Sequence, residues 1–240
     1  MTRIGKQIDT SYNFQEALGD PDKDADKYST VLQDYHQYLW SKRLPNGEIF
    51  KLEKLNTACC LRYISNSDEM ILSSDRAVAT FTKWKRMKHI VDQIPQAQLD
   101  EFINITETIG AIIIWPSTRV DGKTTINGER GFNRKICDRL DLTIECIRRY
   151  YNDESSPLYD TFKRYSSFFK LFEDFKGYVD FFLFQDFVSD DYRAVKVAPP
   201  FDNFESSPVP ATKDEYLAYM NHSINQVNAR NKRIRSYVDN

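Results

Sequence analysis

Apolar residues recur every three or four positions along most of this chain, which is the spacing of a helix with one buried face. Two polar signals mark helix starts. Ser156 precedes a proline at a first helical position, and Thr212 has Glu215 three residues on, which is a capping box. The pattern predicts helices over residues 24–41, 74–94, 96–108, 132–151, 156–172 and 212–239.

Between the first two helices the apolar residues alternate or cluster as they do in strands, over residues 49–52, 58–64 and 70–72. Asn66, Ser67 and Asp68 are the expected hairpin tip. A β-branched run at 111–115 approaches an Asp121-Gly122 turn, from which a second hairpin would return through residues 124–126. A small antiparallel sheet is therefore expected in the N-terminal half.

Nine phenylalanines lie between Phe162 and Phe187, and we expect them to form the packing centre of a helical body. A proline-rich loop, residues 198–210, separates this body from the last helix. Residues 1–21 are predicted to be extended or loop. The fold class is thus α+β and mainly helical, in a single domain over residues 1–240, with a small antiparallel sheet, a Phe-rich helical body and a long C-terminal helix.

Composition excludes several classes of protein. The net charge of −2 excludes a generally basic nucleic-acid coat, although basic and acidic residues are locally segregated. The four cysteines, among them the adjacent Cys59 and Cys60, include no Cys-x-x-Cys pair, so we expect free thiols and no metal site. No signal peptide or membrane-spanning run is evident. The expectation is a cytoplasmic protein that binds neither a membrane nor a cofactor.

The densest charge lies between Arg119 and Tyr151, where six arginines and two lysines accompany five carboxylates. Hydroxyls, amides and glycines precede a predicted helix start there, where anions are favoured, and guanidinium groups bind phosphate in a bidentate manner. This pattern favours a phosphate-bearing ligand, a nucleic acid or a nucleotide. The expected ligand-binding residues are Arg119, Lys123, Asn127, Arg130, Asn133, Arg134, Arg139 and Arg148. Asp138 and Glu145 would hold the arginines or act as acid and base.

A second cluster, TKWKRMKHI, combines stacking and cationic side chains with a histidine. Bases stack on aromatic rings and phosphates contact cations, so Lys83, Trp84, Lys85, Arg86 and Lys88 form a predicted nucleic-acid patch. His89 would join Asp138 and Glu145 in metal-independent RNA cleavage of the toxin or defence type. An amphipathic helix with solvated lysines would show the same pattern. Asp121, Lys123 and Glu107 also permit a metal-dependent nuclease, although Asp121-Gly122 is better explained as a turn.

The last helix carries a heptad-like seam with one polar interruption. The seam residues are Leu217, Met220, Ile224, Val227, Asn231 and Ile234. The alternative function is therefore a non-enzymatic interaction protein, a homodimer through this helix, whose charged segment is a structural salt-bridge network. Burial distinguishes the two hypotheses. Enclosed and paired arginines would be structural, whereas unpaired arginines in an open cleft would bind a ligand.

Four segments, LPNGEIF, FTKWKRMKHIVDQIP, the charged stretch 119–151 and FKGYVDFFLFQDFVSDDY, carry a resemblance. Together they resemble an uncharacterised bacterial protein family of about this length, a domain of unknown function, over nearly the whole chain. The resemblance implies a bacterial or prophage-borne cytoplasmic protein of one domain. It brings no activity, cofactor or catalytic residue.

Overall fold

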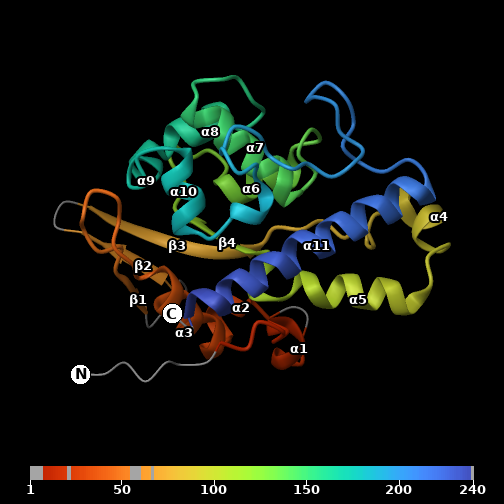
Figure 1. Cartoon of the computed structure of the whole chain (residues 1–240), viewed down its shortest axis with the longest axis horizontal. Coiled ribbons are helices and arrows are strands. Elements are labelled where there is room, and N and C mark those ends of the chain that lie inside the picture. Colours follow the sequence, from red (N-terminus) through yellow and green to blue (C-terminus); the bar gives the residue numbers. More distant parts are fainter. Residues whose placement is uncertain (1–7, 21–22, 55–60, 66–67, 239–240) are drawn as a thin grey trace.

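A four-stranded antiparallel sheet lies at the middle of the molecule, between two groups of helices (Figure 1). The computed structural model describes residues 8–20, 23–54, 61–65 and 68–238. The strands, in the order β1-β2-β3-β4, are β1 (Leu52–Lys54), β2 (Leu61–Ile64), β3 (Glu69–Arg76) and β4 (Ile112–Pro116). Every residue of β4 is buried, which explains its continuous apolar sequence.

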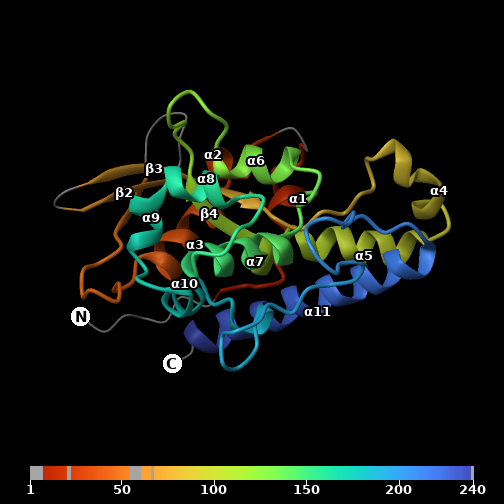
Figure 2. The same ribbon diagram turned by 90° about the horizontal axis from the view of Figure 1, so that it is seen from above.

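Helices cover both faces of this sheet. One face carries α1 (Phe14–Leu18), α2 (Ala25–Tyr28) and α3 (Thr30–Trp40). The other carries α6 (Ile126–Phe132), α7 (Leu140–Tyr151), α8 (Tyr159–Arg164), α9 (Ser166–Lys170) and α10 (Phe175–Phe181) (Figures 1 and 2). To one side of the sheet lie α4 (Lys88–Val91) and α5 (Gln96–Thr106), and the long α11 (Lys213–Val238) runs from beside these two helices toward the end of α3 (Figure 1). Single 3₁₀ turns are η1 (Lys85–Met87), η2 (Ile109–Ala111) and η3 (Gln185–Phe187).

The predicted fold class is confirmed: the chain is mainly helical α+β, with one small antiparallel sheet in its N-terminal half and a long C-terminal helix. All nine phenylalanines from Phe162 to Phe187 are buried in one connected core, as expected of a packing centre. The predicted cap at Thr212 is also confirmed, because the Glu215 backbone N–H donates to the Thr212 hydroxyl at 3.2 Å, while the Glu215 carboxylate accepts from the Ala211 N–H at 2.7 Å. The expected strand portion 58–60, the tip residues Asn66 and Ser67, and Cys59 and Cys60 lie outside the described residues.

The helix predicted over residues 74–94 is wrong in its first half. β3 continues to Arg76, because it pairs antiparallel with β4, nearly forty residues later in the chain, in a register that places Ser74 opposite Ile114. Irregular backbone follows, with Phe81 in the left-handed region at φ 58°. Helical structure begins only at η1 and α4. Local spacing cannot reveal a strand whose partner lies so far along the sequence.

The predicted hairpin over residues 111–126 is wrong, and the predicted helix over residues 132–151 is wrong only in its first part, since α7 does run from Leu140 to Tyr151. Ile126 begins α6, whose N-terminus is capped by the Thr125 hydroxyl accepting from the Gly128 N–H at 3.2 Å. The Asp121-Gly122 turn does form. After α6, residues 133–139 form a turn in which Cys137 and Asp138 both have positive φ. This turn divides the charged segment between α6 and α7.

Three smaller differences concern helix ends. The first predicted helix is broken at Ser29, whose hydroxyl accepts from the Leu32 N–H and starts α3 there. The predicted helix 156–172 is divided into α8 and α9 at Tyr165. The stretch predicted to be extended, residues 1–21, contains α1, capped by Asn13. In the first two cases apolar spacing alone would continue the helix through the break, and in the third a capped single turn of helix was not predicted.

α11 packs along α5 and η2, and its apolar seam faces the core of its own chain (Figure 1). Met220, Val227 and Ile234 are buried, and Leu217 and Ile224 are partly buried against the core. The polar interruption of the seam, Asn231, bonds within its own chain. Its side chain donates to the Thr108 hydroxyl at 2.9 Å and accepts from the Gly110 N–H at 2.8 Å. The seam is therefore an intramolecular contact, and we do not propose dimerisation through it.

The close approach of α11 to η2 gives a first prediction. A Cβ at Gly110 would lie 2.6 Å from both the Asn231 Oδ1 and the Val227 carbonyl oxygen. We expect Gly110→Ala to lower the free energy of unfolding by about 1–3 kcal/mol, because α11 must shift to relieve the overlap. Urea unfolding followed by circular dichroism measures this change.

Gly131→Ala is the matched control, since nothing lies within 4 Å of a Cβ at that helical position. It should leave stability unchanged or raise it by about 0.5–1 kcal/mol. Equal stability of the two variants would contradict the tight contact between α11 and η2.

Candidate functional site

Arg130 joins three parts of the fold and has no exposed surface. Its side chain forms ion pairs with Asp75 on β3 at 2.8 Å and with Asp138 in the 133–139 turn at 2.7 Å. It also donates to the Asn127 side chain at 3.1 Å and to the Thr143 hydroxyl at 3.3 Å. Since these groups enclose its guanidinium, Arg130 does not face a ligand, and Asn127 serves as its partner. Both were expected to bind the ligand.

Arg139 and Arg148 are structural in the same sense. Arg139 is fully buried and forms a bidentate pair with Asp141 at 2.6 and 3.1 Å. Arg148 lies between Glu145 and Glu154, and it donates to each at 2.8–3.0 Å. The Glu145 carboxylate also accepts from Arg149 at 2.7 Å, so two arginines hold it, and it does not line the pocket described below. By the burial criterion, these arginines form a structural network.

The remaining predicted ligand-binding residues of this segment lie apart from one another. Arg119 and Lys123 are exposed in the loop between β4 and α6, and Arg134 is exposed in the 133–139 turn. Asn133 caps that turn by accepting from the Lys135 N–H at 2.9 Å. The structure therefore does not gather these cations into the clamp that their sequence proximity predicted.

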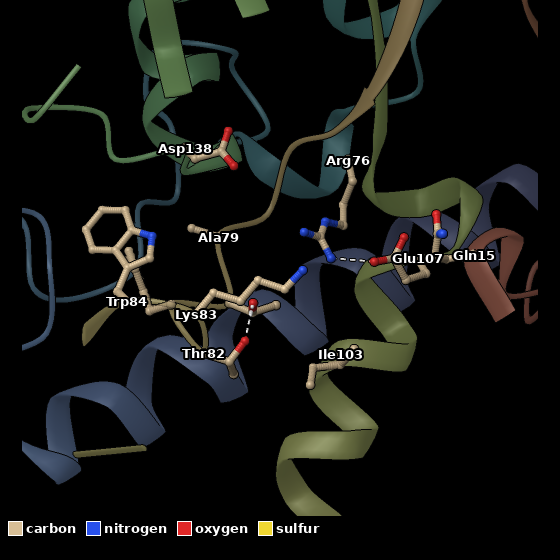
Figure 3. Close-up of a pocket in the computed structure, with 11 residues that line it drawn as sticks. Gln15, Arg76, Ala79, Thr82, Lys83, Trp84, Ile103, Glu107 and Asp138 are labelled. Atoms are coloured by element: carbon tan, nitrogen blue, oxygen red, sulfur yellow. Dashed lines mark hydrogen bonds and ion pairs between the residues drawn. The ribbon is translucent and has the colours of Figure 1, made fainter. Parts of the chain in front are cut away.

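A pocket of about 350 Å³ lies beside the network and does contain predicted residues (Figure 3). Asp138 enters it from the 133–139 turn, and Lys83 and Trp84 enter from the irregular segment after β3. Arg76 comes from the end of β3, and Glu107 from the residue after α5. The other lining residues are Gln15, Ala79, Thr80, Phe81, Thr82 and Ile103.

Two cations meet in this pocket. Figure 3 shows the Lys83 amine and the Arg76 guanidinium directed toward the same space. Arg76 forms an ion pair with Glu107. Lys83 is exposed, and within the described part of the chain it forms no ion pair or side-chain hydrogen bond. Because Glu107 already pairs with Arg76, Lys83 is the cation of this pocket that has no carboxylate partner among the described residues, and it can attract an anionic group.

Asp138 supplies a carboxyl group with unusual electrostatics. Burial raises its pKa, and the cations Arg130 and Arg76 partly oppose that rise. The Asp138 side chain is 36% exposed to solvent, so its carboxyl group is accessible from the pocket. Burial likewise raises the pKa of Asp75, which pairs with the same Arg130 nitrogen, to about 6. A carboxyl that is neutral more often than usual can donate a proton or a hydrogen bond to an anion.

The backbone around the pocket is strained at three non-glycine residues. Phe81, Cys137 and Asp138 have φ values of 58°, 52° and 61°, in the left-handed region. Two of them, Phe81 and Asp138, line the pocket. Such conformations cost free energy and persist where the surrounding structure enforces them, and they are enriched at functional sites. Here they aim the Asp138 carboxyl and the Phe81 ring.

The predicted nucleic-acid patch is divided by the structure. Lys83 and Trp84 line the pocket, and the Arg86 guanidinium lies 4.6 Å from the centroid of the Trp84 ring. Lys85, Lys88 and His89 are exposed on η1 and α4 and do not line it. Lys88 pairs with Asp92 at 3.0 Å. Of the three expected catalytic residues, only Asp138 therefore reaches the pocket.

Three contributors were missed as ligand-site residues: Arg76, Gln15 and Glu107. The sequence suggests Glu107 only as part of a metal-dependent nuclease with Asp121 and Lys123. In the structure Glu107 pairs with Arg76, while Asp121 and Lys123 are exposed in a loop. The one available signal was the charged pair Asp75-Arg76 closing a strand. Among the described residues, no group of three or more His, Cys, Asp or Glu side chains could hold a metal ion.

The fold and site define an α+β protein with a mixed-charge pocket beside a buried arginine network. The chain belongs to the Family of unknown function (DUF6994), which it matches over residues 8–234. Neither a curated protein nor a solved structure matches it. Within the residues described, no helix is sufficiently long and apolar to cross a membrane.

Proposed function

We propose that this protein binds a phosphate-bearing nucleotide, free or within single-stranded RNA, in the pocket of Arg76, Lys83 and Trp84. The observation that carries the proposal is the convergence of the Lys83 amine and the Arg76 guanidinium on one concave space. A phosphate group matches both cations, since a guanidinium binds it through paired donors and an ammonium through charge. Trp84 lies at the same pocket and offers a ring for base stacking.

Asp138 gives the proposal a chemical extension. A carboxyl with a raised pKa beside a bound phosphodiester can protonate the leaving oxygen without a metal ion. RNA cleavage that proceeds in the presence of a chelator and is lost in Asp138→Asn, with binding retained, supports this extension. Retention of RNA without cleavage limits the function to binding.

Binding is tested with a fluorescent single-stranded RNA, followed by anisotropy, with adenosine monophosphate and inorganic phosphate as competitors. We expect Lys83→Glu to weaken binding at least about tenfold, because it replaces an attractive charge by a repulsive one at the pocket. Trp84→Ala should cost about 1–3 kcal/mol of binding free energy through lost stacking. Competition by the free nucleotide, but not by phosphate alone, would indicate that base and phosphate are both recognised.

Lys88→Glu is the matched control. It makes the same charge change five residues away, at a lysine that pairs with Asp92 outside the pocket. If Lys88→Glu weakens RNA binding as much as Lys83→Glu, the interaction is general electrostatic attraction and the pocket is not the site. Unchanged binding by the folded Lys83→Glu protein would overturn the proposal.

A further inference from the structure

A second lysine, Lys42, lies away from the anion pocket and beside three aromatic rings. It follows α3 and lines a different pocket, of about 620 Å³, formed with α10 and the end of α11. Its Nζ lies 5.2, 4.9 and 4.7 Å from the ring centroids of Trp40, Phe181 and Tyr237. It also donates a hydrogen bond to the Phe181 carbonyl oxygen. Among the described residues, no carboxylate forms an ion pair with Lys42.

The surroundings of Lys42 lower its pKa and so disfavour its protonated form. Burial is the main cause and Arg230 adds to it, so that the pKa of Lys42 falls to about 7, although Asp180 opposes the fall. Arg230 is fully buried, and its Cζ lies 5.7 Å from the centroid of the same Trp40 ring. Its guanidinium is held by the backbone carbonyls of Gly110, Ile112 and Phe182. Two cations therefore share one aromatic ring.

Asp180 does not neutralise Lys42, because other donors occupy it. Lys176 forms an ion pair with Asp180, and the Gln185 amide and the Tyr192 hydroxyl donate to it at 2.9 and 2.8 Å. Lys176 lines the same pocket as Lys42, but its bond to Asp180 raises its pKa. One pocket thus holds an amine that gives up its proton readily and an amine that keeps it.

We propose that Lys42 is a carbonyl-reactive amine that condenses with a small aldehyde entering this pocket to form a protonated Schiff base. The Nζ lone pair attacks the carbonyl carbon, a C–N bond forms, and the amine proton passes through water to the oxygen. The resulting carbinolamine hydroxyl takes a second proton and leaves as water, while the nitrogen lone pair forms the C=N bond. No electrons are gained or lost overall.

The surroundings of Lys42 favour this class of electrophile over acylating ones. A protonated imine keeps its positive charge, so it retains the contacts with the three ring faces. It also keeps one N–H, which can donate to the Phe181 carbonyl as the amine does. An acylated lysine would lose the charge and with it the attraction of the rings. The pocket therefore stabilises the protonated aldehyde adduct with the same contacts that hold the lysine ammonium.

The test uses the full chain, propanal as the probe, and cyanoborohydride to trap the imine at pH 7, with peptide mass spectrometry to locate the propyl groups. We expect Lys42 to be labelled at least about tenfold faster than Lys176, since an amine with pKa near 7 is about half neutral at pH 7 and an ordinary lysine is neutral on the order of once in a thousand molecules. Labelling of Lys176 at an equal or higher rate would overturn the proposal.

Two controls test whether the fast labelling depends on the folded structure and whether it occurs at Lys42. In concentrated urea the preference for Lys42 should disappear, because the rings and Arg230 no longer surround it; a preference that persists would also overturn the proposal. Lys42→Arg should remove the fast-labelled position and leave the rate at Lys176 unchanged. If the fast-labelled position remains in this variant, the reactive amine is a different lysine.

Discussion

Replacing Arg139 by methionine should lower the free energy of unfolding by about 3–5 kcal/mol, because it leaves the buried Asp141 carboxylate without its cation. The loss extends to the proline-rich loop. The Arg139 guanidinium donates to the carbonyl oxygens of Ala198, Pro200 and Pro208 at 2.5–3.2 Å. One side chain thus anchors the start of α7 to a segment about sixty residues later, and urea unfolding followed by circular dichroism measures the loss of stability.

Arg134→Met is the matched control, because Arg134 lies five residues earlier in the chain and is exposed. Its effect should stay within about 0.5 kcal/mol. The double variant Arg139→Met with Asp141→Leu should recover part of the lost stability, since it removes the buried charge as well as its partner. Similar denaturation midpoints for Arg139→Met and Arg134→Met would contradict the structural role assigned to the network.

Stability should also fall as the pH rises from about 4 to about 7, and Asp26 should be a main cause. Burial raises the pKa of Asp26 to about 7, while the Ser74 hydroxyl and backbone N–H, which both donate to its carboxylate, oppose that rise. Because the folded pKa exceeds the unfolded one, the stabilisation is complete below the unfolded value and is lost as the pH passes the folded value. The loss attributable to Asp26 is on the order of 3 kcal/mol.

Asp26→Asn isolates this contribution. The amide resembles a protonated carboxyl, since its oxygen can accept from the Ser74 N–H and its amino group can donate to the Ser74 hydroxyl. We expect the variant to match the natural protein near pH 4 and to exceed its stability near pH 8 in urea unfolding. Asp75 and Asp138, whose pKa values are also raised, retain a smaller slope in both proteins. Identical slopes in both proteins would contradict the role of Asp26.

The sequence predicted the elements whose contacts are local. The apolar spacing of α5 and α11 and the Thr212 capping box indicated those helices correctly. It could not predict β3 beyond residue 72, because the strand that pairs with Arg76 lies at Ile112. Nor could it predict the turn that ends α6, since Cys137 and Asp138 adopt backbone conformations that such residues rarely choose by themselves.

The candidate site was only partly predictable for a related reason. Charge density correctly marked residues 119–151 as unusual, but sequence does not show which arginines face inward. Arg130 was expected to bind phosphate. Instead it is buried, where it pairs with Asp75, fifty-five residues earlier, and with Asp138. The pocket combines side chains from α1, β3, the segment after it, α5 and the 133–139 turn. Only a folded chain brings these together.

The position of α11 determines when the fold can close during synthesis. Its side chains contact some of the earliest described residues, as in the hydrogen bond from Arg235 to the Thr10 hydroxyl at 2.7 Å. Arg230 and Asn231 also form hydrogen bonds with the backbone of Gly110 in η2. Contacts so distant in sequence form late, because long loops must close first. During synthesis on the ribosome, the apolar surfaces of α5, η2 and the Phe-rich body that α11 covers would therefore stay exposed to solvent until α11 emerges. The nascent chain should rely on chaperone protection for that interval.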